Sequence, residues 1–177
     1  MIFRRRKDPD LAWFEAEVGE HQRRLYGFAY YHLRDEDDAQ DVVQETFVRL
    51  WSHRSRVQRE TSAAWLTRVC RNACIDRLRK RKTRNEVSTE VDLLSNGQTG
   101  VDERLHRSDV HGRALALLDE LDEPFRSLVI LRDIQDLSYE EIATAMELPM
   151  TTVKVYLHRA RKRLRMRLMK EVRDEVG

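Results

Sequence analysis

The sequence predicts an all-α protein, in which two small helical domains are joined by a flexible acidic linker. Only six glycines and three prolines occur in 177 residues, too few for a turn-rich all-β fold. Apolar residues recur at helical spacing in two blocks, and a stretch with Asn96-Gly97 and Gly100 separates them. The predicted division is an N-terminal tail 1–10, a first domain 11–82, a linker 83–110, a second domain 111–173 and a tail 174–177.

The first domain is expected to contain three helices. The first helix follows from apolar residues at helical spacing: Phe14, Val18, Leu25, Phe28 and Ala29. The second helix should begin near Asp37 or Asp38, where acidic residues favour the amino end of a helix. Its predicted buried stripe is Ala39, Val42, Val43, Thr46 and Leu50. The third helix should run from Ser62, as N-cap, to about Arg81.

The second domain has the signals of a helix-turn-helix. Pro124 marks a break, and Ser138 with Glu141 forms a capping-box pattern that opens a short helix over 139–146. Leu148-Pro149 ends this helix, and Thr151 is the expected cap of a long final helix. A short helix, a tight turn and a basic helix is the layout of DNA-binding helix-turn-helix units.

Charge is sorted along the chain, although the formal net charge is only +2. Residues 150–173 hold nine Lys and Arg against one Glu, and residues 71–84 hold seven against one Asp. Residues 35–45 hold six Asp and Glu with no Lys or Arg, and the linker is also acidic. Two basic segments suit a polyanion that touches both domains. The alternative is that each basic helix end complements the helix dipole and stays solvated.

The final helix has two faces of different chemistry. Its apolar stripe is Val153, Leu157, Ala160, Leu164 and Leu168, and the opposite face is basic. Arg and Lys donate to guanine edges and phosphates, and a Val side chain contacts the thymine methyl. The face therefore favours readout of a DNA major groove, with an ordinary amphipathic helix as the alternative.

Other features are open to more than one interpretation. Trp65 is expected in the core rather than against a base. Val48 is an exposed apolar residue among acidic ones, which indicates a protein contact or an isolated surface side chain. Cys70 and Cys74 lie one turn apart, but no further Cys or His completes a zinc site.

Several classes of protein are not expected. No apolar run approaches the length of a membrane span, no signal peptide is evident, and two cysteines make no disulfide framework, so we expect a cytoplasmic protein without membrane insertion. No phosphate-binding glycine loop and no nucleophile–base arrangement occurs, so we expect no enzyme, no catalytic residue, no cofactor, no metal and no small-molecule substrate.

Three strings resemble the sigma-70 family, specifically the ECF (extracytoplasmic function) group of bacterial RNA polymerase sigma factors. They are DEDDAQDVVQETFVRLW at 35–51, WLTRVCRNACIDRLRKRK at 65–82 and LSYEEIATAMELPMTTVKVYLHRARKRLR at 137–165. The resemblance implies that 11–82 is the domain called region 2 and 111–173 the domain called region 4. It also implies binding to core RNA polymerase, recognition of the −10 and −35 promoter elements as duplex and melted DNA, and control by an anti-sigma factor.

The resemblance assigns residues to three surfaces. Core polymerase would bind Asp41, Gln44, Glu45 and Val48. The −10 element would meet Arg59, Glu60, Thr61, Ser62, Ala63, Arg68, Asn72 and Arg79. The −35 element would meet Thr152, Lys154, Val155, Tyr156, His158, Arg159 and Lys162.

The sequence departs from the family pattern at two positions of the final helix. Thr151 stands where the family often has Gly, and Tyr156 where Arg is frequent, so the promoter sequence is not implied. A different hypothesis is an ordinary helix-turn-helix regulator, which would use the first domain for dimerisation or ligand sensing and would not depend on Asp41, Gln44 and Glu45 for transcription.

Overall fold

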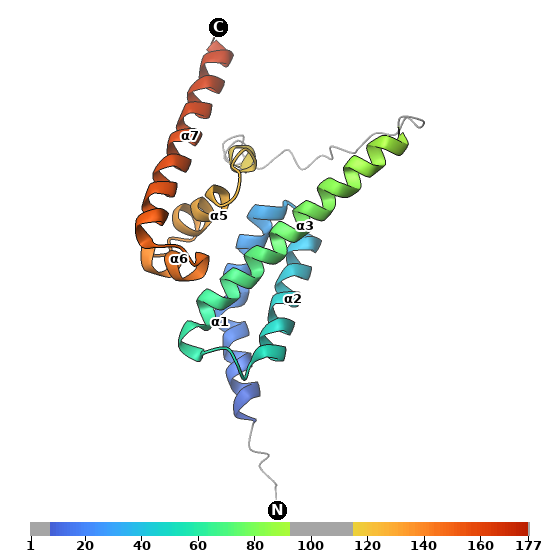
Figure 1. The fold of residues 1–177 in the computed structure, drawn as a ribbon, viewed down its shortest axis with the longest axis vertical. Coiled ribbons are helices and arrows are strands. Elements are labelled where there is room, and N and C mark those ends of the chain that lie inside the picture. Colours follow the sequence, from blue (N-terminus) through green and yellow to red (C-terminus); the bar gives the residue numbers. More distant parts are fainter. Residues whose placement is uncertain (1–7, 93–114, 177) are drawn as a thin grey trace, which may run out of the picture.

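The computed structural model describes residues 8–92 and 115–176, and every regular element in these two ranges is helical. The all-α prediction is confirmed. Three long helices form an N-terminal domain (residues 8–92), and a set of shorter helices with one long helix forms a C-terminal domain (residues 115–176), as Figure 1 shows.

The N-terminal domain begins with α1 (Pro9–Leu33) and α2 (Glu36–His53). Asp8 caps α1, because its carboxylate accepts a hydrogen bond from the Asp10 backbone N–H at 3.0 Å. Asp35 caps α2 in the same way, accepting from the Asp38 N–H at 2.8 Å. The second helix therefore starts slightly before the predicted Asp37 or Asp38, because the cap is the first Asp of the acidic run.

A short 3-10 turn, η1 (Arg59–Thr61), leads directly into α3 (Ser62–Asp92). Ser62 is therefore not the N-cap that the sequence predicts: its hydroxyl donates to the Arg59 carbonyl at 2.8 Å inside a continuous helical turn. The helix also continues ten residues beyond Lys82, into the segment predicted as linker. The rest of that predicted linker, from residue 93 on, lies outside the described residues.

The three helices pack into a bundle around an apolar core. The predicted stripe of α2 is buried in full, and Phe47 extends it. Trp65 is half-buried and packs against this core, as expected. The core residues of the bundle are Leu25, Phe28, Ala29, Leu33, Ala39, Val42, Val43, Phe47, Leu50, Leu66, Cys70, Ala73 and Cys74.

The C-terminal domain contains a helical turn at 115–119, then α5 (Phe125–Val129), the π-helical turn η2 (Ile130–Ile134), α6 (Tyr139–Met146) and α7 (Met150–Val176). Ser138 and Glu141 form the predicted capping box at the start of α6. Thr151 is not a cap, because α7 already begins at Met150. The predicted tail 174–177 is helical up to Val176.

The apolar stripe of α7 is buried only along its first half. Val153, Leu157 and Ala160 are in the core, whereas Leu168 is 43% exposed, because α7 extends beyond the short helices that it packs against. Figure 1 shows the upper part of α7 projecting away from the rest of the domain.

The two domains pack against each other. Helix α6 lies beside α3, and η2 lies against α1 (Figure 1). The Gln135 side chain donates to the Arg24 carbonyl of α1 at 2.8 Å, and buried apolar residues of both domains form one continuous cluster. The interface between the domains is therefore part of the protein core.

Candidate nucleic-acid interface

The solvent-facing side of α7 presents the residues predicted for the −35 element. Lys154, Val155, His158, Arg159 and Lys162 are exposed, while Thr152 and Tyr156 are half-buried. We call this set of seven residues the α7 face. The burial of Val153, Leu157 and Ala160 fixes the rotation of the helix, so the face points away from the domain core.

Several cations near the α7 face are held by partners inside the domain. Arg161 donates through Nε to the Asp133 carboxylate at 3.2 Å, and this hydrogen bond raises the pKa of Arg161. The Arg163 guanidinium lies 4.4 Å from the centre of the Phe125 ring, and Arg167 pairs with Glu120 at 2.7 Å. Arg159 and Lys162 make no such ion pair within the described ranges, which leaves them available to a polyanion.

Tyr156 has a supporting role in the packing of the domain. Its ring centre lies 5.3 Å from that of Phe125, and the side chain is half-buried. Lys154 lies at the opposite edge of the α7 face, with Nζ 5.6 Å from the centre of the Tyr139 ring. These contacts pre-orient the two side chains at the edges of the α7 face.

The residues predicted for the −10 element gather mostly at η1 and the first turns of α3. Arg59, Glu60 and Thr61 are exposed on η1, Ala63 and Arg68 are half-buried, and Asn72 is exposed. We call this set of six residues the η1–α3 face. Ser62 is buried and is occupied by its hydrogen bond to Arg59, so it supports the turn instead of facing solvent.

Arg79 is separate from the η1–α3 face. It is exposed two helical turns beyond Asn72, and it lies 3.9 Å from Asp76 of its own helix. At the other end of the face, the Arg59 guanidinium lies 3.4 Å from Asp10 and 5.3 Å from the centre of the Trp13 ring. The structure therefore brings together six of the eight predicted residues.

The C-terminal domain lies directly against the η1–α3 face. Arg68 forms an ion pair with Glu147, the residue that ends α6. Thr61 and Ala63 line a cavity of about 360 Å³ whose other wall includes Leu137 and Thr144. Glu60 lines the same cavity, so four of the six residues of the η1–α3 face are in contact with, or in a cavity shared with, the second domain.

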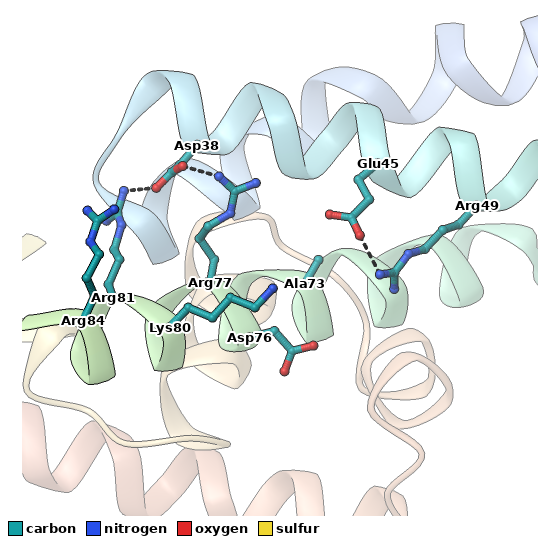
Figure 2. A pocket seen from close by; sticks show the side chains of 9 residues that line it. All are labelled: Asp38, Glu45, Arg49, Ala73, Asp76, Arg77, Lys80, Arg81 and Arg84. Atoms are coloured by element: carbon teal, nitrogen blue, oxygen red, sulfur yellow. Dashed lines mark hydrogen bonds and ion pairs between the residues drawn. The ribbon is translucent and has the colours of Figure 1, made fainter. Parts of the chain in front are cut away.

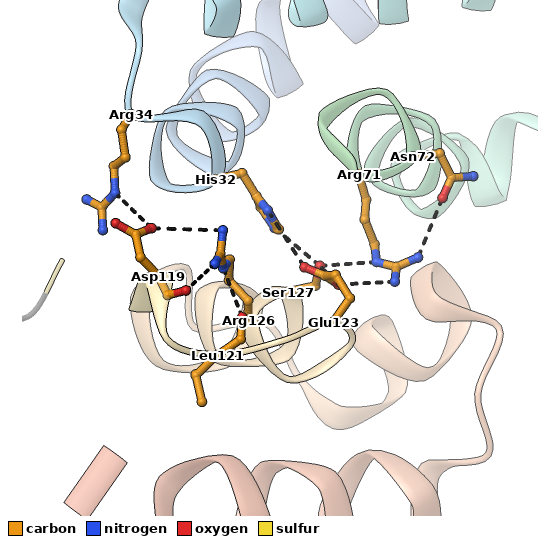
Figure 3. Close-up of polar contacts among 9 residues, drawn as sticks. All are labelled: His32, Arg34, Arg71, Asn72, Asp119, Leu121, Glu123, Arg126 and Ser127. Atoms are coloured by element: carbon orange, nitrogen blue, oxygen red, sulfur yellow. Dashed lines mark hydrogen bonds and ion pairs between the residues drawn. The ribbon is translucent and has the colours of Figure 1, made fainter. Parts of the chain in front are cut away.

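A polar cluster joins the two domains one turn further along α3, as Figure 3 shows. Arg71 donates through Nε to the Ser127 hydroxyl and through Nη2 to the Glu123 carboxylate, both at 3.1 Å. Ser127 in turn donates to Glu123 at 2.6 Å. The Ser127 oxygen also lies 3.2 Å from Nε2 of His32 on α1, so three helices meet at one hydroxyl.

Hydrogen bonding defines the state of His32. Because the single Ser127 proton is used toward Glu123, the contact with His32 requires Nε2–H as donor. Burial lowers the pKa of His32 to about 3, and the positive charges of Arg126, Arg71 and Arg34 act in the same direction. His32 is therefore neutral, and its Nδ1 has no hydrogen-bond partner in the described structure.

Arg34 adds a second link between the domains. It follows α1 with φ of 58° and its side chain donates to the Leu115 carbonyl. Its Nε lies 3.5 Å from the Asp119 carboxylate, which also lies 3.9 Å from Arg126 (Figure 3). Contacts on both sides of His32 thus hold the second domain on α1.

The residues predicted to bind core polymerase share the outer side of α2. Asp41, Gln44, Glu45 and Val48 are all exposed, and Val48 reaches 64% exposure. We call these four residues the α2 face. Glu45 pairs with Arg49 of the same helix at 2.5 Å, and Asp41 lies 3.6 Å from Arg77 of α3.

Behind this face, α2 is held to α3 by charge. Asp38 accepts from both Arg77 and Arg81, as Figure 2 shows. Arg81 also donates to the Leu33 carbonyl at 2.9 Å. The adjoining cavity, of about 410 Å³, is lined by basic side chains of α3 that include Lys80 and Arg84 (Figure 2). Part of the predicted basic segment 71–84 is therefore used to hold the bundle together.

Sequence reasoning missed the residues that connect the domains. His32, Arg71, Glu123, Ser127 and Glu147 were not singled out, although Arg71 was counted in the basic segment. Arg71 lies three residues after Arg68, on the same side of α3, which is the one local signal that pointed to it.

Cys70 and Cys74 are both buried in the bundle. A hydrogen bond with Cys70, together with burial, raises the pKa of the Cys74 thiol. Across residues 8–92 and 115–176, no group of three potential metal ligands comes together, and no helix has an apolar stretch long enough to span a bilayer.

Two family models match this chain in order along the sequence. The model described as Sigma-70 region 2 matches residues 18–84, and the model described as Sigma-70, region 4 matches residues 111–164. The ECF RNA polymerase sigma factor SigE of Mycolicibacterium smegmatis is 35% identical over 87% of this chain, which spans 60% of that protein. The RNA polymerase sigma factor SigV of Bacillus subtilis is 33% identical over 87% of this chain and 90% of its own length.

Two solved structures are similar over most of both chains. CnrH, solved in complex with the cytosolic domain of CnrY, aligns with a TM-score of 0.66 and 27% identity over 89% of this chain and 88% of its own. The sigma factor RpoE of Bartonella quintana, solved with the anti-sigma factor NepR, aligns with a TM-score of 0.67 and 25% identity over 88% of this chain and 96% of its own.

Proposed function

This chain belongs to the sigma-70 family, in its ECF group, and we propose that it binds core RNA polymerase, directs it to promoters and helps to open the DNA. Sigma factors are transcription initiation factors, and the chain contributes recognition instead of a catalytic step. The observation that supports this most is the pairing of regions 2 and 4 in one chain with a basic face on α7, on which Arg159 and Lys162 are exposed and make no ion pair within residues 8–92 and 115–176.

The α7 face is our candidate for the −35 element. Residues in the first turns of a recognition helix reach base edges in the major groove, so Thr152, Lys154, Val155 and His158 face the bases. Arg159 has no ion-pair partner in the described part of the chain, and a guanidinium can donate two hydrogen bonds to guanine. Lys162, one turn later, reaches phosphate.

The η1–α3 face is our candidate for the −10 element. Melting exposes bases that can leave the stack, and unstacking costs a few kcal/mol that contacts to the protein must offset. Asn72 is exposed and has both donor and acceptor atoms for a base edge, while Arg59 and Arg68 offer charge to the backbone. Arg79 lies beyond the face and suits a phosphate of the neighbouring duplex.

The α2 face is our candidate for core polymerase. Three polar side chains lie in the two turns of α2 that precede an exposed Val48, a combination that places polar groups beside an apolar side chain in a protein contact. The relative RpoE was solved with the anti-sigma factor NepR. By analogy, we propose that an anti-sigma factor controls this chain as well.

Reconstitution with purified core polymerase tests the proposed function. The protein should bind core and start transcripts at a small set of sites on genomic DNA fragments, where core alone starts none. If it fails to bind core, or if the start sites are unchanged by its addition, the proposal is wrong. A plain helix-turn-helix regulator would instead bind duplex DNA alone and leave the start sites of core unchanged.

A further inference from the structure

We propose that in the free protein the C-terminal domain covers the η1–α3 face, with Glu147 and Glu123 occupying Arg68 and Arg71 in place of DNA phosphates. The inference rests on the proposed function, because it takes the η1–α3 face as the surface that captures single-stranded DNA. It adds a regulatory contact that is built into the chain itself.

The first support is the chemistry of the two carboxylates. Each reaches across the domain boundary to an arginine on the same side of α3: Glu147 to Arg68, and Glu123 to Arg71. A carboxylate and a phosphate present similar acceptor oxygens to a guanidinium. The two anions therefore compete for the same donors, and a DNA strand must displace the C-terminal domain to use them.

The second support is the position of Glu147. It ends α6 with φ of 54°, a left-handed conformation that favours glycine or asparagine over glutamate. A glutamate at this position keeps a carboxylate beside Arg68, at a conformational cost that glycine would avoid. The ion pair is itself accessible to water, since 65% of the Glu147 side chain and 33% of that of Arg68 are exposed, so it opens readily.

The third support is the buried cluster that accompanies this exposed pair. Arg71 is 19% and Glu123 27% exposed, and both bind Ser127, which contacts a fully buried His32. Ser127 and His32 are buried, and buried polar groups that lose their partners are costly, so this cluster holds the cover more firmly than the Arg68–Glu147 pair does. The exposed pair covers the DNA-binding arginine and the buried cluster anchors the domain.

The cover is selective. It contacts the η1–α3 face, whereas Val155, His158, Arg159 and Lys162 of the α7 face stay exposed in the same arrangement. The free protein is thus open to duplex DNA and closed to single-stranded DNA. Separation of the domains is then the step that makes the η1–α3 face available, and it is needed only once a promoter is being opened.

The test uses the full chain with E123Q/E147Q, which removes both charges and keeps the side-chain shapes. The control is D122N/D136N, which removes two exposed carboxylates of the same domain that make no contact with the η1–α3 face. Small-angle scattering reports the arrangement of the domains. Fluorescence anisotropy reports binding to a labelled single-stranded 20-mer with the non-template −10 sequence, and to a −35 duplex.

We expect the wild type and the control to scatter as the closed arrangement, and E123Q/E147Q to be more expanded. If closed protein is in tenfold excess over open protein, loss of the cover should tighten single-strand binding about tenfold, with the −35 duplex affinity matching that of the control. The proposal that the C-terminal domain covers the η1–α3 face would be wrong if the wild type were expanded, or if E123Q/E147Q and the control bound the single strand with equal affinity. Because scattering needs neither core polymerase nor promoter, its outcome is independent of whether the proposed function holds.

Discussion

Acidification from pH 7 to pH 5 should cost the protein about 2 kcal/mol of stability through one side chain, His32. The native pKa of His32 is lowered to about 3, from an ordinary value of 6.5. Its neutral ring is enclosed by charged groups from both domains: Arg34, Arg71, Glu123 and Arg126. Above pH 6.5 both the folded and the unfolded states carry neutral His32, so its contribution to stability is constant.

Below pH 6.5 His32 becomes protonated in the unfolded chain but stays neutral in the native protein. Each pH unit between 6.5 and 3 then removes about 1.4 kcal/mol, and 1.5 units give the figure of about 2 kcal/mol. The matched variant is H32Q, whose amide can still donate to Ser127 but does not titrate. H53Q, which alters an exposed histidine of α2, is the control.

Urea unfolding followed by circular dichroism at pH 7.0 and 5.0 measures the effect. Between pH 7.0 and pH 5.0, the free energy of unfolding of the wild type and of H53Q should fall by about 2 kcal/mol more than that of H32Q. If H32Q loses as much stability as the wild type does, His32 is not a buried neutral group and the geometry of the domain interface is wrong.

Four further changes test the surfaces and the helix-turn-helix. V48D should weaken binding to core polymerase at least tenfold without lowering the melting temperature, because Val48 is 64% exposed. N72A should impair promoter opening more than duplex binding, and a pre-melted template should restore its transcription. R159A should weaken −35 binding by about 1–3 kcal/mol if the guanidinium reads a base. S138A should cost about 1 kcal/mol in thermal unfolding, because the capping box of α6 is lost, whereas T151A inside α7 should change stability little.

The controls for these variants use the same chemistry elsewhere. M166D places an Asp at an exposed apolar residue of α7 and should leave core binding unchanged. R165A removes an exposed cation just beyond the α7 face and should change the salt dependence of binding more than its sequence preference. The assignment of the α2 face would be contradicted if M166D lost core binding. The assignment of Arg159 would be contradicted if R165A and R159A lost sequence preference equally. The assignment of Asn72 would be contradicted if a pre-melted template failed to restore transcription by N72A.

Local sequence patterns predicted most of the helices of the fold. The stripe of α2 and the capping box of α6 were predicted correctly because helical periodicity and Ser-x-x-Glu depend on neighbouring residues alone. The caps proposed at Ser62 and Thr151 were wrong for a related reason: both hydroxyl residues follow segments that had already become helical, η1 and Met150. Local propensity indicates that a helix begins nearby, and the preceding chain decides where.

The domain interface could not be predicted from such patterns. Arg71 and Glu123 are 52 residues apart, and most Arg and Glu side chains stay in water, so nothing in their local sequence marks this pair as part of the interface. The local sequence of His32 does not distinguish it from the other histidines, because its contact with Ser127 forms only when α5 packs against α1. The candidate DNA-binding residues remain predictions. Those for the −35 element lie on α7 alone, where helical spacing determines which side chains share a face, whereas those for the −10 element lie on η1 and α3.

Footprinting of the complex tests most directly whether this chain directs polymerase to promoters and opens them. With core polymerase and this protein together, a promoter should show protection over the −35 element and permanganate-reactive thymines around the −10 element, while core alone shows neither. N72A should keep the −35 protection and lose the reactive thymines. If the protein protects duplex DNA alone and core adds no reactive thymines, the chain acts as an ordinary DNA-binding regulator and does not open promoters with core polymerase.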